Sequence, residues 1–547
     1  MRKARYTCFL VFGLWLAGNI AWLSLDQRLP AYDDAGHAIR ALEVGTALMQ
    51  GSWAGLIRSL KEEYPPLAYL VSAPAAWIYP QADLLVGLMD AVFGSLFAIS
   101  LWRIGCLLGS PWVGVGALGL ALAQAHLLNA TRLFYLDFPL VAMVTATTWR
   151  ILVCERQWSL RNASLLGLTL GLGMLTKTAY AGYVLPVVFW LGLRVSGRDS
   201  SWTARLIPAA VAVGVATVTA SWWYWLSWEK FSAWISRTTW EATWVEHDPS
   251  GASLAGWVFY PNFGGWAMLV IAWTVGATLL LWRGPAFSRA LIGWTVLGYA
   301  GLCLHPNKDV RYVLPLVPLF ALGAWWGLAQ IRILWARRGL QAVVVLWSLV
   351  QVGVLSSARV DAWVGRALSS PRIWAEGSTP WFNRTLVPAG LAAAPMPDEG
   401  AAGPVADIVK QIADRQAPRE PRVLMLLEDP CQNFQTLRYA CILRGVRIRV
   451  QTVAFLWTDQ GVWNVRLQPW DWDIVITRAA GTPELPVFGM SKYLERNVAL
   501  LTPWLREMRD RYVLSGRFPV RFTGYPRSPY MVEVYARPAI MWARGGE

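Results

Sequence analysis

Carboxylates are concentrated in a polar segment, residues 26–65, that follows the first apolar run. Asp33, Asp34 and His37 lie within five residues of one another, and a second acidic pair precedes two prolines. Ionisable groups beside a bilayer are costly unless they are solvated or used in a reaction. A carboxylate here could act as a general base toward a hydroxyl group. Taken alone, the segment is better explained as a solvated loop.

Four further polar insertions interrupt the apolar runs. Their sequences are TRLFYLDFPL at 131–140, GLGMLTKTAYAGYVLP at 171–186, WVEHDP at 244–249 and HPNKDVRYVLP at 305–315. Each has an ordinary explanation, since Asp137 could cap a helix and Lys177 could extend toward the interface. The topology derived below places all of them on one side of the membrane. Together they would provide carboxylates for proton abstraction and cations for an anionic leaving group.

The composition predicts that a bilayer surrounds these segments. Of the 547 residues 55% are hydrophobic and only 15% are charged, which is too apolar for a soluble protein of this length. The 35 tryptophans fit membrane interfaces. The net charge of +15 is better explained by basic cytoplasmic loops than by nucleic-acid binding.

We expect about eleven transmembrane helices in a membrane domain over residues 1–356. They lie near residues 1–25, 84–104, 111–129, 137–154, 163–177, 180–193, 206–226, 263–282, 288–304, 311–330 and 340–356. The basic loops then fall on the cytoplasmic side together with the N-terminus. The first run is long for a cleaved signal peptide, so we favour an uncleaved helix. Residues 66–80 are interpreted as a juxtamembrane or re-entrant helix, although a true span there would reverse the local topology.

The composition changes after residue 357. Residues 357–405 are expected to form a linker, and residues 406–547 a small external α/β domain. Its predicted strands are 422–428, 446–453 and 473–477, with helices near 431–443 and 492–510. Its role would be to pack over the membrane domain or to hold an acceptor. If 431–443 is one helix, Cys431 and Cys441 lie about 15 Å apart along it, so we expect free or buried thiols.

The ordered motifs resemble those of the GT-C glycosyltransferases. YDDAGHAIRA is similar to the acidic motif, often Asp-Glu, of the first external loop in that family, and EYPPL to the end of that loop. LDFPL, GLGMLTK and NKDVRYVLPLVP resemble later signatures in the family's order. WVEH is similar to a stretch of the lipid A aminoarabinose transferases, which with the protein O-mannosyltransferases form the most similar branches. The resemblance covers about residues 7–330.

This resemblance implies an α-helical polytopic membrane protein with the GT-C fold. It also implies inverting transfer of a sugar from a polyprenyl or dolichyl monophosphate donor to an envelope acceptor, which could be a lipid, a glycan or a protein. Asp33 matches the family's Asp and would act as the base, with Asp34 in the usual Glu position and Asp137 as a second carboxylate. The residues assigned to substrate binding are His37, Tyr64, Arg132, Lys177, Lys308, Arg311 and Tyr312. Tyr64 replaces a Lys of the aminoarabinose branch, which counts against that sugar.

Glu63 and His247 match positions that could share a divalent metal in the aminoarabinose branch. A hydrogen bond between them explains the pair more simply, because two ligands do not make a zinc site. We expect no required cofactor. Two other functions stay open at this point: a transporter or flippase of lipid-linked saccharides, which would be expected to show an internal repeat, and a non-catalytic envelope scaffold. The expected location is the inner membrane of a bacterium, with the C-terminal domain in the periplasm.

Overall fold

The computed structural model divides the chain into two compact units. Unit 1 comprises Met1–Leu25, Ala41–Tyr79 and Asp83–Pro395, and unit 2 comprises Asp26–Arg40, Pro80–Ala82 and Met396–Glu547. The residues whose structure is described are 1–30, 32–197, 201–240, 246–247, 267–284, 286–304, 307–308, 310–357, 359–360, 401–416, 419–426, 434–452, 472–478, 506–520 and 530–538.

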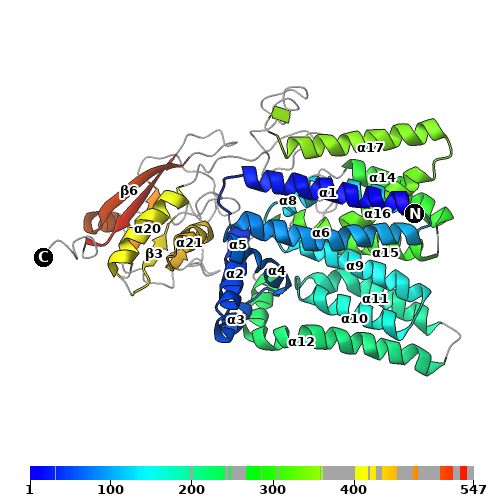
Figure 1. Cartoon of the computed structure of the whole chain (residues 1–547), viewed down its shortest axis with the longest axis horizontal. Coiled ribbons are helices and arrows are strands. Elements are labelled where there is room, and N and C mark those ends of the chain that lie inside the picture. Colours follow the sequence, from blue (N-terminus) through cyan, green and yellow to red (C-terminus); the bar gives the residue numbers. More distant parts are fainter. Residues whose placement is uncertain are drawn as a thin grey trace. The chain divides into compact units, whose positions relative to one another are not determined.

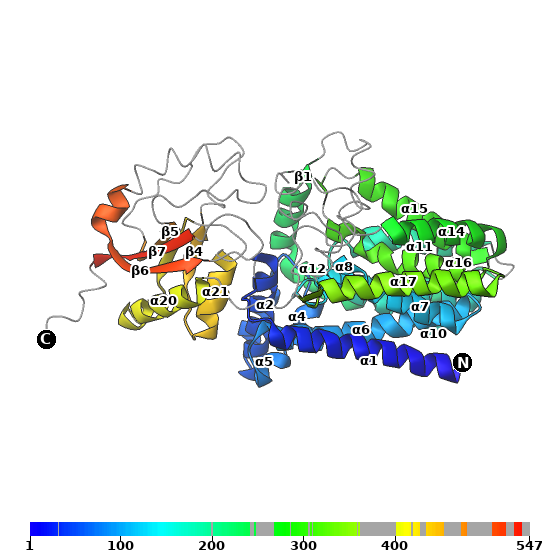
Figure 2. The same ribbon diagram turned by 90° about the horizontal axis from the view of Figure 1, so that it is seen from above.

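Unit 1 is a bundle of long apolar helices, of which α1, α6 and α17 run roughly parallel in both views (Figures 1 and 2). Its main helices are α1 (Arg2–Leu25), α6 (Ala82–Leu107), α7 (Pro111–Leu122), α8 (Ala125–Ala130), α9 (Asp137–Arg156), α10 (Leu160–Met174), α11 (Tyr180–Ser196), α12 (Trp202–Trp240), α14 (Ala267–Arg283), α15 (Ala286–Leu304), α16 (Val317–Ala329) and α17 (Leu334–Val354). A 3₁₀ helix, η1 (Val310–Leu316), precedes α16. Apolar runs fold as helices in lipid because each backbone N–H and C=O must find a partner within the segment.

All eleven predicted spans coincide with helices, and the span expected at 111–129 is divided into α7 and α8. Among the described residues, five helices are long and apolar enough to cross a membrane: Arg2–Leu25, Ala82–Leu107, Asp137–Arg156, Trp202–Ala233 and Arg311–Ala329. Shorter apolar helices account for others of the predicted spans. The number that cross the bilayer stays a prediction.

Close helix packing in unit 1 depends on glycine. A Cβ added at Gly167 of α10 would lie 2.3 Å from the backbone oxygen of Ala212 in α12, and one at Gly276 of α14 would lie 1.8 Å from that of Gly323 in α16. No larger side chain fits at such an approach. Small residues let helix backbones come together in the membrane, where van der Waals packing replaces the hydrophobic effect as the force between helices.

The segment expected to be an external loop, residues 26–65, contains two helices that were not predicted. It forms α2 (Tyr32–Met49) and α3 (Trp53–Leu60), and α3 lies across one end of the long helices (Figure 1). The N-cap Ser52 accepts a hydrogen bond from the backbone N–H of Gly55. The expected helix at 66–80 consists of α4 (Leu67–Ser72) and α5 (Ala75–Ile78). Together these two helices reach only about 18 Å, well short of a hydrocarbon core of about 30 Å.

Unit 2 contains a five-stranded sheet with the strand order β4-β3-β5-β7-β6. The strands are β3 (Arg422–Met425), β4 (Arg449–Thr452), β5 (Ile474–Arg478), β6 (Val513–Val520) and β7 (Tyr530–Ala536). β3 is parallel to β4 and β5, while β7 is antiparallel to β5 and β6. The three predicted strands are confirmed, whereas β6 and β7 were not predicted.

Two helices cover one face of this sheet. They are α20 (Ala402–Gln416) and α21 (Phe434–Leu443), whose apolar side chains share a core with Val423 and Met425 of β3. The intervening Leu424 packs on the opposite face with Tyr535, as expected for alternating strand residues. The predicted linker therefore ends before 405, because α20 begins at Ala402. The predicted helix 492–510 is described only from residue 506, where the chain is helical.

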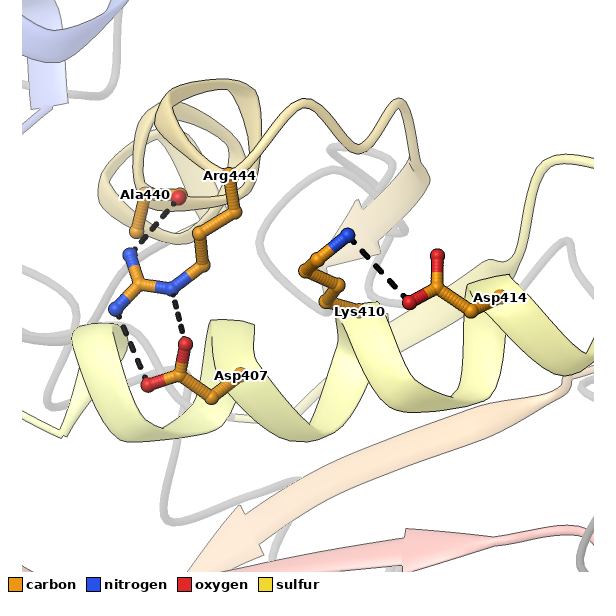
Figure 3. Close-up of polar contacts among 5 residues, drawn as sticks. All are labelled: Asp407, Lys410, Asp414, Ala440 and Arg444. Carbon is orange, nitrogen blue, oxygen red and sulfur yellow. Dashed lines mark hydrogen bonds and ion pairs between the residues drawn. The ribbon is translucent and has the colours of Figure 1, made fainter.

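A guanidinium fork joins α20 to α21. Arg444 donates from Nε to Oδ1 of Asp407 at 2.6 Å and from Nη2 to Oδ2 at 3.2 Å, and it also reaches the carbonyl of Ala440 at 3.1 Å (Figure 3). These hydrogen bonds from Arg444 lower the pKa of Asp407. The buried thiol of Cys441 is free, as predicted, and burial raises its pKa to about 12. Cys431 lies outside the described residues.

Residues 26–40 belong to unit 2, although from the sequence we grouped all of 26–83 with the membrane domain. Leu29 packs against the core of the sheet, and Thr436 of α21 donates to the carbonyl of Pro30 at 2.9 Å. The backbone N–H of Ala82 donates to the hydroxyl of Tyr439 at 2.7 Å. Contacts between segments about 400 residues apart leave no local pattern, so the sequence alone could not reveal them.

Candidate active site

A buried ion pair joins two of the predicted site residues in unit 1. The ammonium of Lys177 lies 2.7 Å from Oδ1 of Asp137, and the two side chains are 16% and 3% exposed respectively. Asp137 occupies the first turn of α9, where the partial positive charge of the helix N-terminus favours a carboxylate. Lys177 follows the end of α10. The motifs LDFP and MLTK therefore do more than mark helix ends, because Asp137 of the first forms an ion pair with Lys177 of the second.

The end of α10 is fixed by two neighbouring segments. The backbone N–H of Leu67, at the start of α4, donates to the carbonyl of Leu175 at 2.8 Å. The hydroxyl of Tyr224 in α12 donates to the carbonyl of Met174 at 3.0 Å. The segment that ends in EYPPL thus lies directly against the segment that carries Lys177.

Arg311 and Tyr312 reach the same region through η1, which packs against α9. The guanidinium of Arg311 lies 5.1 Å from the ring centroid of Tyr135, two residues before Asp137. The hydroxyl of Tyr183 donates to the backbone carbonyl of Tyr312. The motif at 305–315 is therefore attached to the turn that begins α9 and to α11. Three predicted insertions meet there, and Asp137 is paired with Lys177.

The fourth insertion, at 244–249, contacts the motif at 305–315 through its backbone. Strand β1 (Glu246–His247) pairs with β2 (Asn307–Lys308) in antiparallel fashion, with Glu246 opposite Lys308 and His247 opposite Asn307. Glu246–His247 and Asn307–Lys308 are thus neighbours. The side chains of His247 and Lys308 lie outside the described residues, so their roles stay predictions.

Arg132 has a different environment from the other predicted cations. It is 4% exposed and lies over the ring of Trp22 at 4.8 Å. Its guanidinium donates to the carbonyl of Leu355 and, at 2.6 Å, to the hydroxyl of Ser356. These contacts connect the turn before Asp137 to the end of α17. Arg132 thus holds the turn in place, and its assignment as a phosphate ligand stays a prediction.

The acidic pair lies on the part of α2 that belongs to unit 2. Asp33 is exposed, whereas Asp34 and His37 are 5% and 8% exposed. Both carboxylates occupy the first turn of the helix, where its dipole favours them. The base must be reached by an incoming hydroxyl group, so exposure distinguishes Asp33 from Asp34.

Glu62, which was not assigned a role from the sequence, forms the described ion pair of the KEEYPP segment. It is 8% exposed, and its Oε1 lies 2.9 Å from Nζ of Lys230 in α12. Glu63 and Tyr64 are half-buried. Within the described part of the chain, no three His, Cys, Asp or Glu side chains lie close enough to hold a metal ion. The side chain of His247 is outside the described residues, so a metal shared by Glu63 and His247 stays a prediction.

A buried polar network was also missed. Asp90 of α6 is fully buried, and Asn19 of α1 donates to its Oδ2 at 3.1 Å and to the hydroxyl of Thr131 at 2.7 Å. The sequence did contain a signal for this network, namely Asp90 within the apolar run LLVGLMDAVFG. Ionisable residues inside membrane spans are rare and usually have a function. The network supports the turn that precedes Asp137.

Comparisons with known proteins found similar sequences and similar folds. The family described as dolichyl-phosphate-mannose-protein mannosyltransferase matches residues 63–225, a range that includes Asp137 and Lys177 but not Asp33. A polyprenol-phosphate-mannose–protein mannosyltransferase of Corynebacterium glutamicum is 27% identical over 36% of this chain. The match spans 45% of that relative's length.

Solved structures show the fold over nearly the whole chain. ArnT from Cupriavidus metallidurans in the apo state has a TM-score of 0.58 and 16% identity, covering 96% of this chain and 97% of its own. The same protein bound to undecaprenyl phosphate has a TM-score of 0.57. Arabinofuranosyltransferase AftD from Mycobacteria has a TM-score of 0.53 and 13% identity, covering 97% of this chain and 40% of its own.

The chain therefore has the fold of the GT-C glycosyltransferases, as the ordered motifs predicted. It is a multi-pass membrane protein with a small α/β domain after the helical bundle. Identity to the solved structures is low, so what is shared with them is the architecture.

Proposed function

We propose that this chain is an integral membrane glycosyltransferase. It transfers a sugar, with inversion, from a polyprenyl-phosphate donor to an envelope acceptor that is a lipid, a glycan or a protein. The observation that carries this proposal is the convergence of four segments around the Asp137–Lys177 pair in a chain with the GT-C fold. The relatives add support, because one is named for a polyprenol-phosphate-mannose donor and another was solved with undecaprenyl phosphate.

The proposed reaction is a single displacement at the anomeric carbon. The acceptor hydroxyl attacks this carbon and gives its proton to a carboxylate, for which Asp33 is the candidate. The bond between the anomeric carbon and the phosphate oxygen breaks, and polyprenyl monophosphate leaves with the bonding electrons. Inversion follows because the nucleophile and the leaving group occupy opposite faces of the sugar. A general base of this kind contributes about 10²–10⁴-fold.

Cations are needed where negative charge develops on the leaving phosphate. Lys177 and Arg311 are the described candidates: the ammonium of Lys177 is held in place by Asp137, and the guanidinium of Arg311 lies over Tyr135. Lys308 and Tyr312 complete the proposed set. A charge held in advance at low solvent exposure stabilises a transition state more than a mobile surface charge does. Asp137 is accordingly a positioning residue, while Lys177 contacts the phosphate.

The proposed location is the inner membrane, with the reaction on its outer face. The basic residues between the apolar runs favour a cytoplasmic N-terminus, which places the polar insertions and the C-terminal domain in the periplasm. A polyprenyl chain would anchor the donor in the bilayer, so that only its phosphate and sugar need to reach the polar end of unit 1.

The test is an assay of polyprenyl-phosphate release in nanodiscs. Purified protein is supplied with a panel of polyprenyl-phosphate sugars and envelope extracts, and the released monophosphate is quantified. We expect release with at least one donor, and a loss of about 100-fold or more in Asp33→Asn. Glu155→Gln is the matched control, because Glu155 forms an ion pair of 3.2 Å with Arg194 near the other end of α9. Near-normal release by Asp33→Asn would refute the base assignment.

A further inference from the structure

Unit 2 contains a cavity lined by arginines. It has a volume of about 380 Å³ and is lined by Arg419, Glu420, Arg422 and Arg449. Three guanidinium groups face one carboxylate, which leaves a net charge of +2. The cavity is formed wholly within unit 2, and none of its residues takes part in the proposed transfer reaction.

The sheet itself brings two of the guanidinium groups together. Arg422 begins β3 and Arg449 begins β4, and the parallel register pairs these two residues directly. Adjacent strands lie about 4.8 Å apart, so the side chains start from neighbouring positions. Like charges opposite one another destabilise a sheet unless a counter-charge is present. Pairing alone therefore does not explain why both positions carry arginine.

The carboxylate of the cavity neutralises only part of this charge. Glu420 lies 3.2 Å from Nε of Arg449, and the two side chains are 42% and 74% exposed, so the pair is weak. Arg422 is oriented instead by the ring of Trp472, whose centroid lies 5.3 Å from its guanidinium carbon. Its backbone N–H donates to Oδ2 of Asp473 at 2.8 Å, which fixes the start of β3. The Arg422 guanidinium is thus held against Trp472, and among the described residues no carboxylate forms an ion pair with it.

We propose that this cavity binds a phosphate monoester. Such a group carries about −1.5 to −2 charges at pH 7, which matches the net charge of the lining. Guanidinium groups form paired hydrogen bonds to phosphate oxygens, and a held, stacked arginine loses less entropy on binding than a flexible lysine. The volume also suffices for the sugar that bears the phosphate. On the proposed function, the cavity would hold a phosphate-bearing acceptor.

The binding test uses the full chain in phosphatidylcholine nanodiscs with radiolabelled glucose 6-phosphate in equilibrium dialysis. Arg449→Gln should weaken binding about tenfold, because one charge-assisted interaction is lost. Glu420→Gln should tighten binding about threefold, since the competing carboxylate is removed. Arg511→Gln is the control, because Arg511 pairs with Glu507 at 3.0 Å outside the cavity. No donor is present, so binding succeeds or fails independently of transfer.

Two further arms define the ligand. Glucuronate should compete at least about tenfold less well than glucose 6-phosphate, because a carboxylate has fewer acceptor oxygens and less charge than a phosphate monoester. If the natural ligand is a lipid phosphate of the bilayer, phosphatidic acid in the nanodisc should weaken the binding of glucose 6-phosphate. If the natural ligand is a soluble phosphate monoester, phosphatidic acid should leave this binding unchanged. Either result supports the site. Failure of glucose 6-phosphate to bind would overturn the proposal. Equal loss in Arg511→Gln, or weaker binding in Glu420→Gln, would also overturn it.

Discussion

Removing the carboxylate of Asp137 should leave a largely buried ammonium without its partner. At 2.7 Å and an effective dielectric constant of about 20, the gross attraction between the two charges is about 6 kcal/mol. In the variant, hydration of the Lys177 ammonium, whose side chain is 16% exposed, offsets part of this lost attraction. We therefore expect Asp137→Asn to lower the free energy of unfolding by about 3 kcal/mol, the lower end for breaking a buried pair.

The double variant Asp137→Asn/Lys177→Met separates stability from function. It contains no orphan charge, so its stability should return to within about 1 kcal/mol of the wild type. If the ammonium of Lys177 contacts the leaving phosphate, release of polyprenyl phosphate should nevertheless fall about 100-fold in both Lys177→Met and the double variant. Unfolding is followed by tryptophan fluorescence during SDS titration in mixed micelles, and release is measured with saturating donor.

The control pair lies near the other end of the same helix. Glu155→Gln should cost less than about 1 kcal/mol, because its partner Arg194 is 52% exposed. Recovery of turnover together with stability in the Asp137→Asn/Lys177→Met variant would show that the pair only supports the fold. That result would refute the role proposed for Lys177.

Two further perturbations test the packing of each unit. Gly173→Ala should lower the yield of folded protein and destabilise it by about 1–3 kcal/mol, because the added Cβ would lie 2.1 Å from the ring of the buried Tyr180. The control is Gly182→Ala, because no atom lies within 4 Å of a Cβ added at Gly182. Equal destabilisation by the two substitutions would contradict the packing of Gly173 against Tyr180. In unit 2, hydrogen bonds from Arg444 hold the pKa of Asp407 below its usual value. The stabilisation from this shift is therefore present at neutral pH and is lost as the pH falls through the lowered pKa of Asp407. Asp407→Asn should flatten the acid limb of the unfolding curve measured by circular dichroism, and an unchanged limb would contradict this.

The helical bundle was largely predictable because lipid imposes a simple rule. An apolar run of sufficient length must satisfy its own backbone, so it forms a helix wherever it occurs. The break between α7 and α8 was not predicted, although Gln124, whose side chain caps α8, interrupts the apolar run of residues 111–129 at that point. The strand β6 was missed because VLSGRFPV contains both glycine and proline, which are depleted in strands. The strand β7, YMVEVYA, is rich in valine and tyrosine and could have been predicted.

The sequence predicted which residues belong to the candidate site, but it did not predict which of them contact one another. Asp137, Lys177 and Arg311 were identified because charges at the ends of apolar runs are conspicuous. That Asp137 binds Lys177, whereas Arg132 binds the end of α17, depends on contacts between distant helices. The placement of Asp33 on a helix within unit 2 likewise depends on packing that involves α21.

The central claim is tested most directly by following both products of one turnover. Protein in nanodiscs is given a donor labelled in its sugar and in its polyprenyl phosphate, together with the acceptor fraction. We expect one polyprenyl monophosphate released for each sugar transferred, and the opposite anomeric configuration in the product by NMR. A donor that stays intact while it moves to the other leaflet would instead indicate a flippase, and would contradict glycosyl transfer.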